Sequence, residues 1–134
     1  MVAGAVVSAA ATYTFFRWRP FRVEVQGDSM APMLVAGDWA LAVAPKTLRR
    51  GDVVVLEPPG RPGLEVVKRV AGVGGDLAPD GRILGRDEVW VEGDNPARST
   101  DSRHFGPVDR HVVRARVRLV YWPASRRRIL RPRR

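Results

Sequence analysis

A serine in a tight turn is the first residue of this chain that could do covalent chemistry. The sequence contains no cysteine, which excludes thiol nucleophiles, thiolate metal sites and disulfides. Ser29 follows a predicted strand in the turn GDSMAP at 27–32, which would expose its hydroxyl and place backbone N–H groups near an oxyanion. Taken alone, a serine between glycine and proline is more often only a turn residue.

A serine nucleophile needs a general base, and the sequence offers two kinds. A Ser-His-Asp triad would use His104 or His111, but both lie in polar stretches that favour surface histidines. Lys68, one of only two lysines among 23 basic residues, lies in the apolar run VVKRV at 66–70. Desolvation, together with the positive charge of Arg69 beside it, is expected to lower the Lys68 pKa until a neutral amine can accept the serine proton. The alternative is a strand lysine whose side chain simply reaches solvent.

A third group of polar residues, GDNPARSTDSR, lies at 93–103. One interpretation is a long solvent-exposed loop. The other is an organising loop, whose short hydrogen-bonding side chains orient the lysine amine and pair with Arg69. The composition of the segment suits both interpretations.

Short strands, rather than helices, must position these residues. Residues 21–26 alternate apolar and polar, and apolar or alternating runs recur at 39–43, 52–56, 64–71, 89–92 and 112–122. The run 52–56 is too continuously apolar to face solvent on one side. Glycine- and proline-rich turns separate the runs, and no amphipathic helix of about 11 residues stands out after position 20. The 134 residues suffice for one core, so we predict a mainly β fold, a compact all-β catalytic domain at 20–124.

The two ends of the chain differ from this body in composition. Residues 1–16 carry no charge, and aromatic residues and arginines follow at 15–19, so 1–19 is predicted to be an apolar membrane-anchor helix. A cleaved secretory signal and a buried core helix are the alternatives. Residues 125–134 form a basic tail, interpreted either as a disordered, solvated end or as a contact with anionic lipid head groups.

Four segments of the chain, in order, resemble the motif boxes of type I signal peptidases. They are GDSMAPML at 27–34, RGDVVVL at 50–56, VKRVAGVGGD at 67–76 and GDNPARSTDSRHFGPV at 93–108. Each box alone is weakly specific, whereas four boxes in the right order are highly specific. The short span between the third and fourth boxes also resembles the minimal members, the Gram-positive signal peptidases and the mitochondrial inner-membrane peptidases.

The resemblance implies roles for six residues. Ser29 would be the nucleophile, Lys68 the general base, Ser99 a hydrogen-bond partner of the lysine amine, and Asp101 with Arg69 and Arg103 a supporting ion-pair cluster. It also implies an all-β core with an apolar surface seated on the membrane, no metal or cofactor, and a preference for small residues at −1 and −3 of the cleavage site. The implied partners are membrane lipids and exported preproteins that carry signal peptides.

Three positions depart from the family pattern. Met33 replaces a threonine of the first box, and Gly74 stands where the third box often has proline. Gly27 occupies a position where some members have a serine whose hydroxyl helps to bind the oxyanion. In this chain the oxyanion would therefore depend on backbone N–H groups, that of Ser29 among them.

The resemblance implies a single-pass enzyme of the cell (inner) membrane with its catalytic domain on the extracytoplasmic face. Its substrates would be exported proteins in general or, for a dedicated maturation protease, one exported protein. Arg17, Arg19 and Arg22 conflict with this orientation, because the positive-inside rule would keep them in the cytoplasm.

Two other classes of protein share part of this pattern. The net charge of +9 and the arginine-rich run at 112–122 would suit a nucleic-acid-binding β-barrel. The interleaved aromatic residues of a base-stacking platform are missing, so no nucleic-acid partner is expected. A self-cleaving repressor-type protease would share the Ser-Lys pair, but nothing before position 20 could form its DNA-binding domain.

Overall fold

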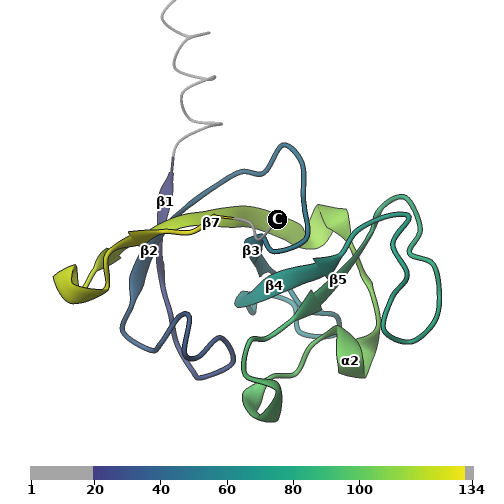
Figure 1. Ribbon diagram of the computed structural model, residues 1–134, viewed down its shortest axis with the longest axis horizontal. Helices are drawn as coiled ribbons and strands as arrows, with labels where there is room; N and C mark the ends of the chain where they lie inside the picture. The colour runs from purple at the N-terminus through teal and green to yellow at the C-terminus, as the bar shows by residue number, and fades with distance from the viewer. Residues whose placement is uncertain (1–19, 132–134) are drawn as a thin grey trace, which may run out of the picture.

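The computed structural model describes residues 20–131, which form a curled antiparallel sheet (Figure 1). The predicted anchor helix at 1–19 and the end of the basic tail, 132–134, lie outside the described residues. Within residues 20–131, no helix has the length and apolar character needed to cross a membrane. The mainly β prediction is confirmed for this part of the chain.

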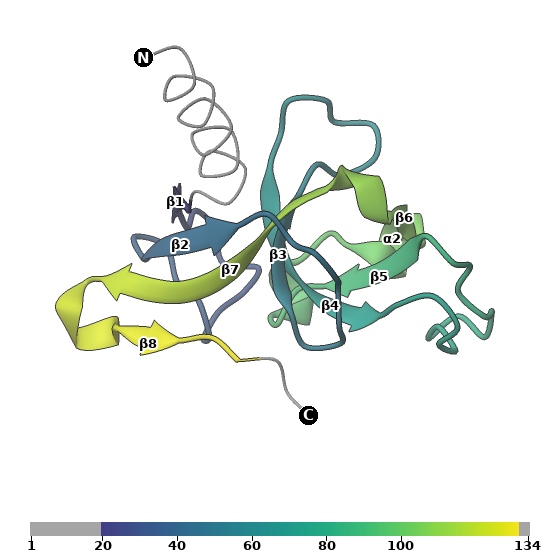
Figure 2. The same ribbon diagram turned by 90° about the horizontal axis from the view of Figure 1, so that it is seen from above.

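The sheet contains eight strands, all paired antiparallel. They are β1 (Phe21–Glu24), β2 (Trp39–Val43), β3 (Val53–Leu56), β4 (Val66–Gly72), β5 (Glu88–Glu92), β6 (Val108–Asp109), β7 (Val113–Trp122) and β8 (Arg128–Ile129). Their order is β1-β2-β7-β3-β4-β5-β6, and β8 pairs with β7. The long strand β7 therefore links the β1–β2 half of the sheet to the half that contains β4 and β5 (Figure 2).

Four short helical segments lie in the connections. They are η1 (Pro96–Arg98), α2 (Ser102–Phe105), η2 (Arg110–Val112) and η3 (Ala124–Arg126). Asp101 caps α2 by accepting the backbone N–H of Arg103 through its carboxylate. In the described part of the chain, α2 is the only α-helix, and its cap belongs to the polar loop that follows β5.

Strand β3 joins the two halves of the hydrophobic core. Val53 and Val55 pack in a cluster that includes residues of β2 and β7. Val54 and Leu56 pack on the opposite face with residues of β4 and β5. All four residues of β3 are buried, which confirms the prediction that this run is covered on both sides.

Three Gly-Asp pairs end tight turns of the same geometry. In 35–38, 49–52 and 73–76, the glycine has a φ of 93°, 92° and 91°, as the third position of a type II turn requires. The carboxylate of the following aspartate accepts the backbone N–H three residues earlier, at 3.0, 2.9 and 2.9 Å. The first turn ends the segment that carries Ser29, and the other two lie on either side of the β3–β4 hairpin.

The predicted strands agree with the structure to within a few residues, whereas the interpretation of the basic tail as disordered does not. Strand β2 has the predicted bounds, and η2 replaces the beginning of the run predicted at 112–122. The two-residue strands β6 and β8 are absent from the prediction because they are too short to show a period. The disordered interpretation of 125–134 is wrong for its described part, because η3 and β8 lie there and Leu130 packs against the core.

Candidate active site

Lys68 is a buried lysine on β4. Its side chain faces inward opposite Val54 of β3 and only 4% of the residue is exposed. Burial lowers the pKa of the amine, the nearby Asp101 carboxylate opposes this effect, and the Arg103 cation reinforces it, so that the pKa lies below its ordinary value. The structure therefore excludes the alternative of a strand lysine that reaches solvent.

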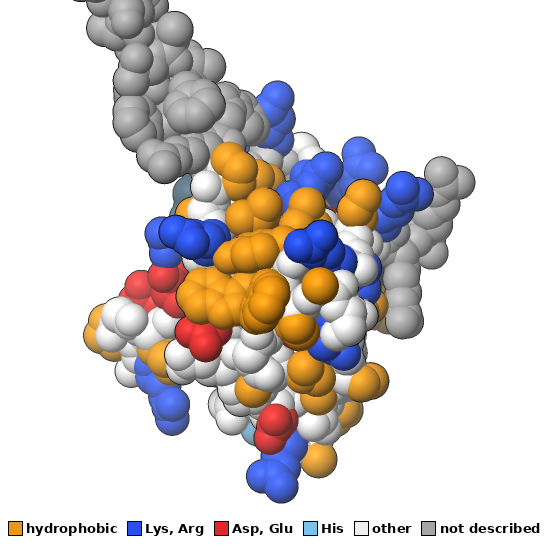
Figure 3. Space-filling view, turned by 90° about the vertical axis from the view of Figure 1, so that its left-hand side faces the viewer, with side chains coloured by type: hydrophobic (Ala, Val, Ile, Leu, Met, Phe, Trp, Pro, Cys, Tyr) orange, Lys and Arg blue, Asp and Glu red, His pale blue; other side chains and the backbone are white. Residues whose placement is uncertain are grey.

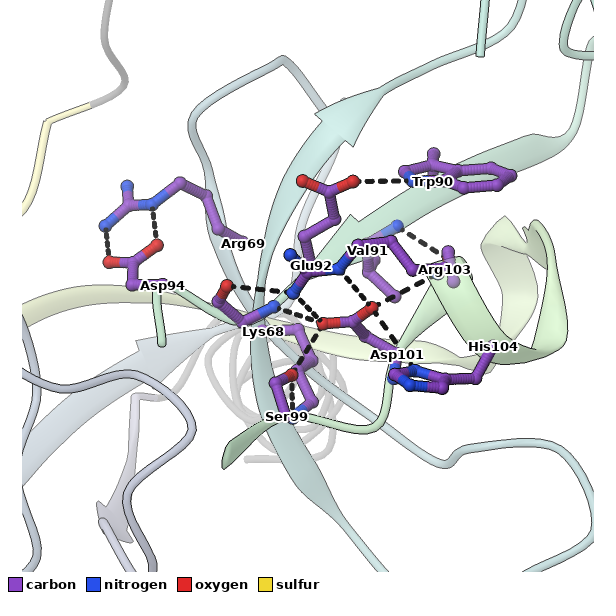
Figure 4. Close-up of polar contacts among 12 residues, drawn as sticks. Lys68, Arg69, Trp90, Val91, Glu92, Asp94, Ser99, Asp101, Arg103 and His104 are labelled. Carbon is purple, nitrogen blue, oxygen red and sulfur yellow. Dashed lines mark hydrogen bonds and ion pairs between the residues drawn. The ribbon is translucent and has the colours of Figure 1, made fainter. Parts of the chain in front are cut away.

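The Lys68 amine belongs to a chain of buried hydrogen bonds (Figure 4). Its Nζ atom lies 3.0 Å from Ser99 Oγ, and Ser99 Oγ lies 2.6 Å from Asp101 Oδ2. Ionised Asp101 can only accept, so the Ser99 hydroxyl donates its proton to Asp101 and accepts from Lys68. Because Ser99 does not use the Lys68 lone pair, that lone pair is available to accept a proton from another group.

Asp101 organises this part of the site. The residue has no exposed surface, and its carboxylate accepts the Gly93 N–H at 2.8 Å and two guanidinium bonds from Arg103 at 2.6 and 2.9 Å. Burial raises its pKa, but the hydrogen bonds from Arg103, Ser99 and Gly93 outweigh that effect and hold the pKa well below its usual range. Asp101 is thus a fixed anion that orients Ser99.

Arg69 lies in a separate ion pair, which corrects the single cluster implied by the resemblance. It donates to both carboxylate oxygens of Asp94 at 2.8 Å and to the carbonyl oxygen of Gly51 at 2.9 Å. Successive side chains of a strand point to opposite faces, so Arg69 points away from Lys68 and Asp101. The cation that lowers the Lys68 pKa is Arg103 and not Arg69. The predicted pairing of the organising loop with Arg69 is nonetheless found, through Asp94.

The turn that carries Ser29 is held against the polar loop at 93–103. Asn95 donates its backbone N–H to the Ser29 carbonyl at 2.9 Å and its side-chain amide to the Asp28 carbonyl at 3.1 Å. Gly93 lies between Ser29 and Ser99, because a Cβ atom placed on it would be 2.6 Å from the Ser29 carbonyl oxygen and 2.5 Å from Ser99 Cβ. The nucleophile candidate is therefore next to the Ser99–Lys68 pair.

The Ser29 hydroxyl makes no hydrogen bond to any described residue, and Lys68 Nζ donates to Ser99. Ser29 is half-buried and lies where the turn follows β1. A direct Ser29–Lys68 hydrogen bond is not formed in this conformation. Contacts between a nucleophile and its base are commonly loose without substrate and tighten when it binds.

Ser29 also lines a groove of about 580 Å³. The walls of the groove are β1, which is an edge strand of the sheet, and residues 64–67. Its apolar surface includes Val25, Met30, Val55 and Val67. A larger depression of about 810 Å³, between 57–63 and 107–114, is lined by none of the predicted site residues, so size alone does not mark the site.

Gly93 and Asn95 were not predicted as individual site residues, although both lie in the organising loop. The signal was present in the Gly-Asp-Asn run, since glycine permits close backbone approach and asparagine can bond to backbone groups on a neighbouring turn. His104 and His111 are surface residues as predicted, with 57% and 79% of their side chains exposed. Within 20–131 no group of acidic or histidine side chains could hold a metal ion.

Comparison with known proteins finds similarity over nearly the whole chain. A family model described as "Signal peptidase, peptidase S26" matches residues 1–79 and 77–122. The chain is 30% identical over 154 residues to mitochondrial inner membrane protease subunit 2 of Danio rerio, covering 98% of this chain and 80% of that protein.

Two further relatives are mitochondrial inner membrane protease subunit 1 of Mus musculus and of Xenopus tropicalis. The mouse protein is 34% identical over 116 residues, covering 77% of this chain and 70% of the relative. The Xenopus protein is 37% identical over 86 residues, covering 58% of this chain, and the match spans about half of the relative, 52% of its length. The family-model match includes the segments that carry the candidate site, at 27–34, 67–76 and 93–108.

Proposed function

Because the chain belongs to the signal peptidase family, peptidase S26, we propose that it is a serine endopeptidase that removes signal peptides from exported proteins. Ser29 is the nucleophile and Lys68 is the general base. The observation that carries the proposal is the buried Lys68 amine, which has a lowered pKa and a lone pair that Ser99 does not use.

The proposed reaction is acyl transfer. Neutral Lys68 accepts the proton of the Ser29 hydroxyl while the oxygen attacks the scissile carbonyl, and Lys68 then gives this proton to the leaving amine. Water, deprotonated by the same amine, adds to the ester carbonyl, and the peptide acid is released as Ser29 recovers its proton. Backbone N–H groups of the turn, that of Ser29 among them, stabilise the oxyanion.

The supporting residues act through the amine and through the loop. Ser99 accepts a hydrogen bond from Lys68, Asp101 fixes Ser99, and Arg103 opposes the influence of Asp101 on the pKa of Lys68. Arg69 acts at a different point, because its ion pair with Asp94 holds the beginning of the organising loop. None of these roles requires a metal or a cofactor.

The groove beside Ser29 fits an extended substrate segment. An edge strand such as β1 has unpaired backbone groups that can bind a peptide as an additional strand. Valine and methionine side chains line the groove, and in this groove we assign the preference for small substrate side chains at −1 and −3 that the family resemblance implies. The substrates are therefore exported preproteins with small residues at these positions, or a single such protein if the enzyme is a dedicated maturation protease.

An exposed apolar face supports an association with membrane lipids. Trp122 of β7 is 55% exposed and pairs with Trp39 of β2, while Ile129 of β8 is 63% exposed and pairs with Leu119. Figure 3 shows hydrophobic side chains gathered on one face with basic side chains around them. Aromatic and basic residues together favour a membrane interface, and we place the domain on the extracytoplasmic face of the cell membrane.

The test is cleavage of a preprotein with an Ala-x-Ala site by the full chain in membrane vesicles. Ser29→Ala and Lys68→Ala should each abolish cleavage, and Lys68→Arg should be equally inactive because a guanidinium is not deprotonated. Thr47→Ala, which removes an exposed hydroxyl from the connection between β2 and β3, is the matched control and should cleave at the wild-type rate. A wild-type rate for Lys68→Ala would refute the mechanism.

A further inference from the structure

The loop that carries Ser29 is closed at its base by backbone hydrogen bonds. Val25 donates its N–H to the Asp38 carbonyl at 2.9 Å, and Gly37 donates its N–H to the Val25 carbonyl at 3.0 Å. Residues 26–37 therefore form a loop, the nucleophile loop, with its neck at Val25 and Asp38. Because the Ser29 hydroxyl makes no hydrogen bond to a described residue, its position depends on how this loop is held.

A buried carboxylate at the neck of the nucleophile loop forms an ion pair with a partly exposed arginine of the C-terminal segment. Asp38 is 1% exposed, and its carboxylate accepts the Val35 N–H at 3.0 Å and Arg126 Nε and Nη2 at 2.7 and 3.1 Å. Burial raises the Asp38 pKa, but the hydrogen bonds from Arg126 and Val35 outweigh it, so the pKa is lowered and the carboxylate is charged. A buried carboxylate depends strongly on its cationic partner.

Arg126 also reaches the outgoing part of the same loop. Its Nη2 atom lies 3.4 Å from the Pro32 carbonyl and 3.4 Å from the Met33 carbonyl. Arg126 belongs to η3, 88 residues from Asp38 in the sequence. The nucleophile loop is thus held at its tip by Asn95 and at its base by Arg126, and these two anchors come from different parts of the chain.

We propose that Arg126 is a positioning residue for Ser29, which it acts on through Asp38 and the carbonyl groups of Pro32 and Met33. By fixing the neck and the outgoing part of the nucleophile loop, it sets the distance between Ser29 and Lys68. The inference rests on the proposed function, because it assigns Arg126 to the same reaction. It also gives the described part of the basic C-terminal segment a role in catalysis.

The kinetic test compares two neighbouring arginines in the full membrane-bound chain. Arg126→Ala should lower kcat by between about 10- and 100-fold and change KM less than about threefold, because misplacing a reacting group by an ångström costs rates of this order. Arg126→Lys, which keeps a cation beside Asp38, should recover part of the loss. The matched control is Arg127→Ala, because Arg127 donates to the Tyr121 carbonyl at 3.0 Å and has no contact to the nucleophile loop.

Two readouts separate positioning from a loss of folding. The pH at which activity falls on the acid side, which reports Lys68, should be the same in Arg126→Ala as in the wild type, with rates measured well below the unfolding temperature. Amide hydrogen exchange at Leu34, Val35 and Asp38 should be at least about tenfold faster in Arg126→Ala and unchanged in Arg127→Ala. Equal kcat values for the two alanine variants, or a kcat loss with wild-type exchange, would overturn the inference.

Failure of the proposed function would look different. In that case the wild-type chain would not cleave the preprotein, or Ser29→Ala would still cleave it. The exchange measurement needs no activity, so it would still show whether Arg126 holds the nucleophile loop.

Discussion

The Lys68 amine donates to Ser99 Oγ at 3.0 Å, and the Ser99 hydroxyl in turn donates to Asp101 Oδ2 at 2.6 Å. The direction of these bonds matters for a general base. If Ser99 donated to Lys68, it would occupy the lone pair that must accept the nucleophile proton. Because the Ser99 hydroxyl donates its hydrogen bond to Asp101, Ser99 orients the Lys68 amine without occupying the lone pair of that amine.

Removing the Ser99 hydroxyl should therefore impair the chemical step. Ser99→Ala leaves the Lys68 amine buried without its acceptor, and kcat for preprotein cleavage should fall by about 10- to 100-fold, a part of the 10²–10⁴ that a positioned base supplies. KM should remain within about twofold, because Ser99 does not line the groove. Steady-state kinetics on the full chain would measure both constants.

The matched control is Ser102→Ala, the other buried serine of this loop. Its hydroxyl accepts the Val91 N–H at 2.9 Å and does not contact Lys68. Losing that acceptor should cost about 1–3 kcal/mol of unfolding free energy, because a buried N–H is left unpaired. kcat should stay close to the wild-type value. A Ser99→Ala enzyme with wild-type kcat would show that Ser99 does not orient the base.

The pH dependence of the rate should follow the lowered pKa of Lys68. The base acts when it is neutral, so kcat/KM should rise as the pH increases through the Lys68 pKa, which lies below the ordinary 10.5. Arg103→Ala removes a cation that lowers the Lys68 pKa and leaves the opposing effect of the Asp101 carboxylate uncompensated. The pH at which kcat/KM falls on the acid side should therefore be higher in this variant. Arg98 is an exposed arginine of the same loop, and Arg98→Ala should leave this pH unchanged. If Arg103→Ala has the same acid-side pH dependence as the wild type, Arg103 does not lower the pKa of the general base.

Burial of a lysine should also reduce stability in a pH-dependent way. The folded pKa of Lys68 is depressed, so the unfolded chain binds more protons between the folded value and 10.5, and stability falls as the pH decreases through this window. Lys68→Met should be inactive but more stable than the wild type, and the gain should grow as the pH decreases from 10.5. Denaturant unfolding at several pH values would measure the difference. A stability gain that is the same at all pH values would refute this linkage.

Much of the fold was predictable because strand alternation is a local signal. The runs at 39–43 and 52–56 match β2 and β3 closely, and the polar–apolar alternation of 112–122 matches β7. The turns at the three Gly-Asp pairs were also predictable, since a glycine that allows positive φ and a carboxylate after it specify a turn within four residues. Short strands such as β6 and β8 depend on their partners and have no pattern of their own.

Contacts between distant segments were the part that sequence reasoning could not supply. Adjacent strand residues face opposite sides, which predicts that Lys68 and Arg69 diverge, but the choice of Asp94 over Asp101 depends on the path of the loop. The pair between Asp38 and Arg126 is invisible in sequence for the same reason. An arginine-rich end resembles a disordered tail until the fold places a buried carboxylate beside it.

The close approach of Ser29 and Ser99 across Gly93 gives the sharpest steric test. Gly93 is not among the glycines with positive φ, so alanine is acceptable to its backbone, and only space is limiting. An added Cβ would lie 2.5 Å from Ser99 Cβ and 2.6 Å from the backbone carbonyl oxygen of Ser29, which forces the nucleophile turn and the organising loop apart. Gly93→Ala should cost about 1–3 kcal/mol of stability through overpacking and lower kcat by about 100-fold through misplacement of the reacting groups.

In Gly85→Ala the nearest atom is Glu88 Oε1 at 3.0 Å, the mobile end of a side chain, so that variant should keep full activity. Kinetics and thermal unfolding of both variants would decide, and a fully active Gly93→Ala would mean that Ser29 and Ser99 need not lie side by side for cleavage.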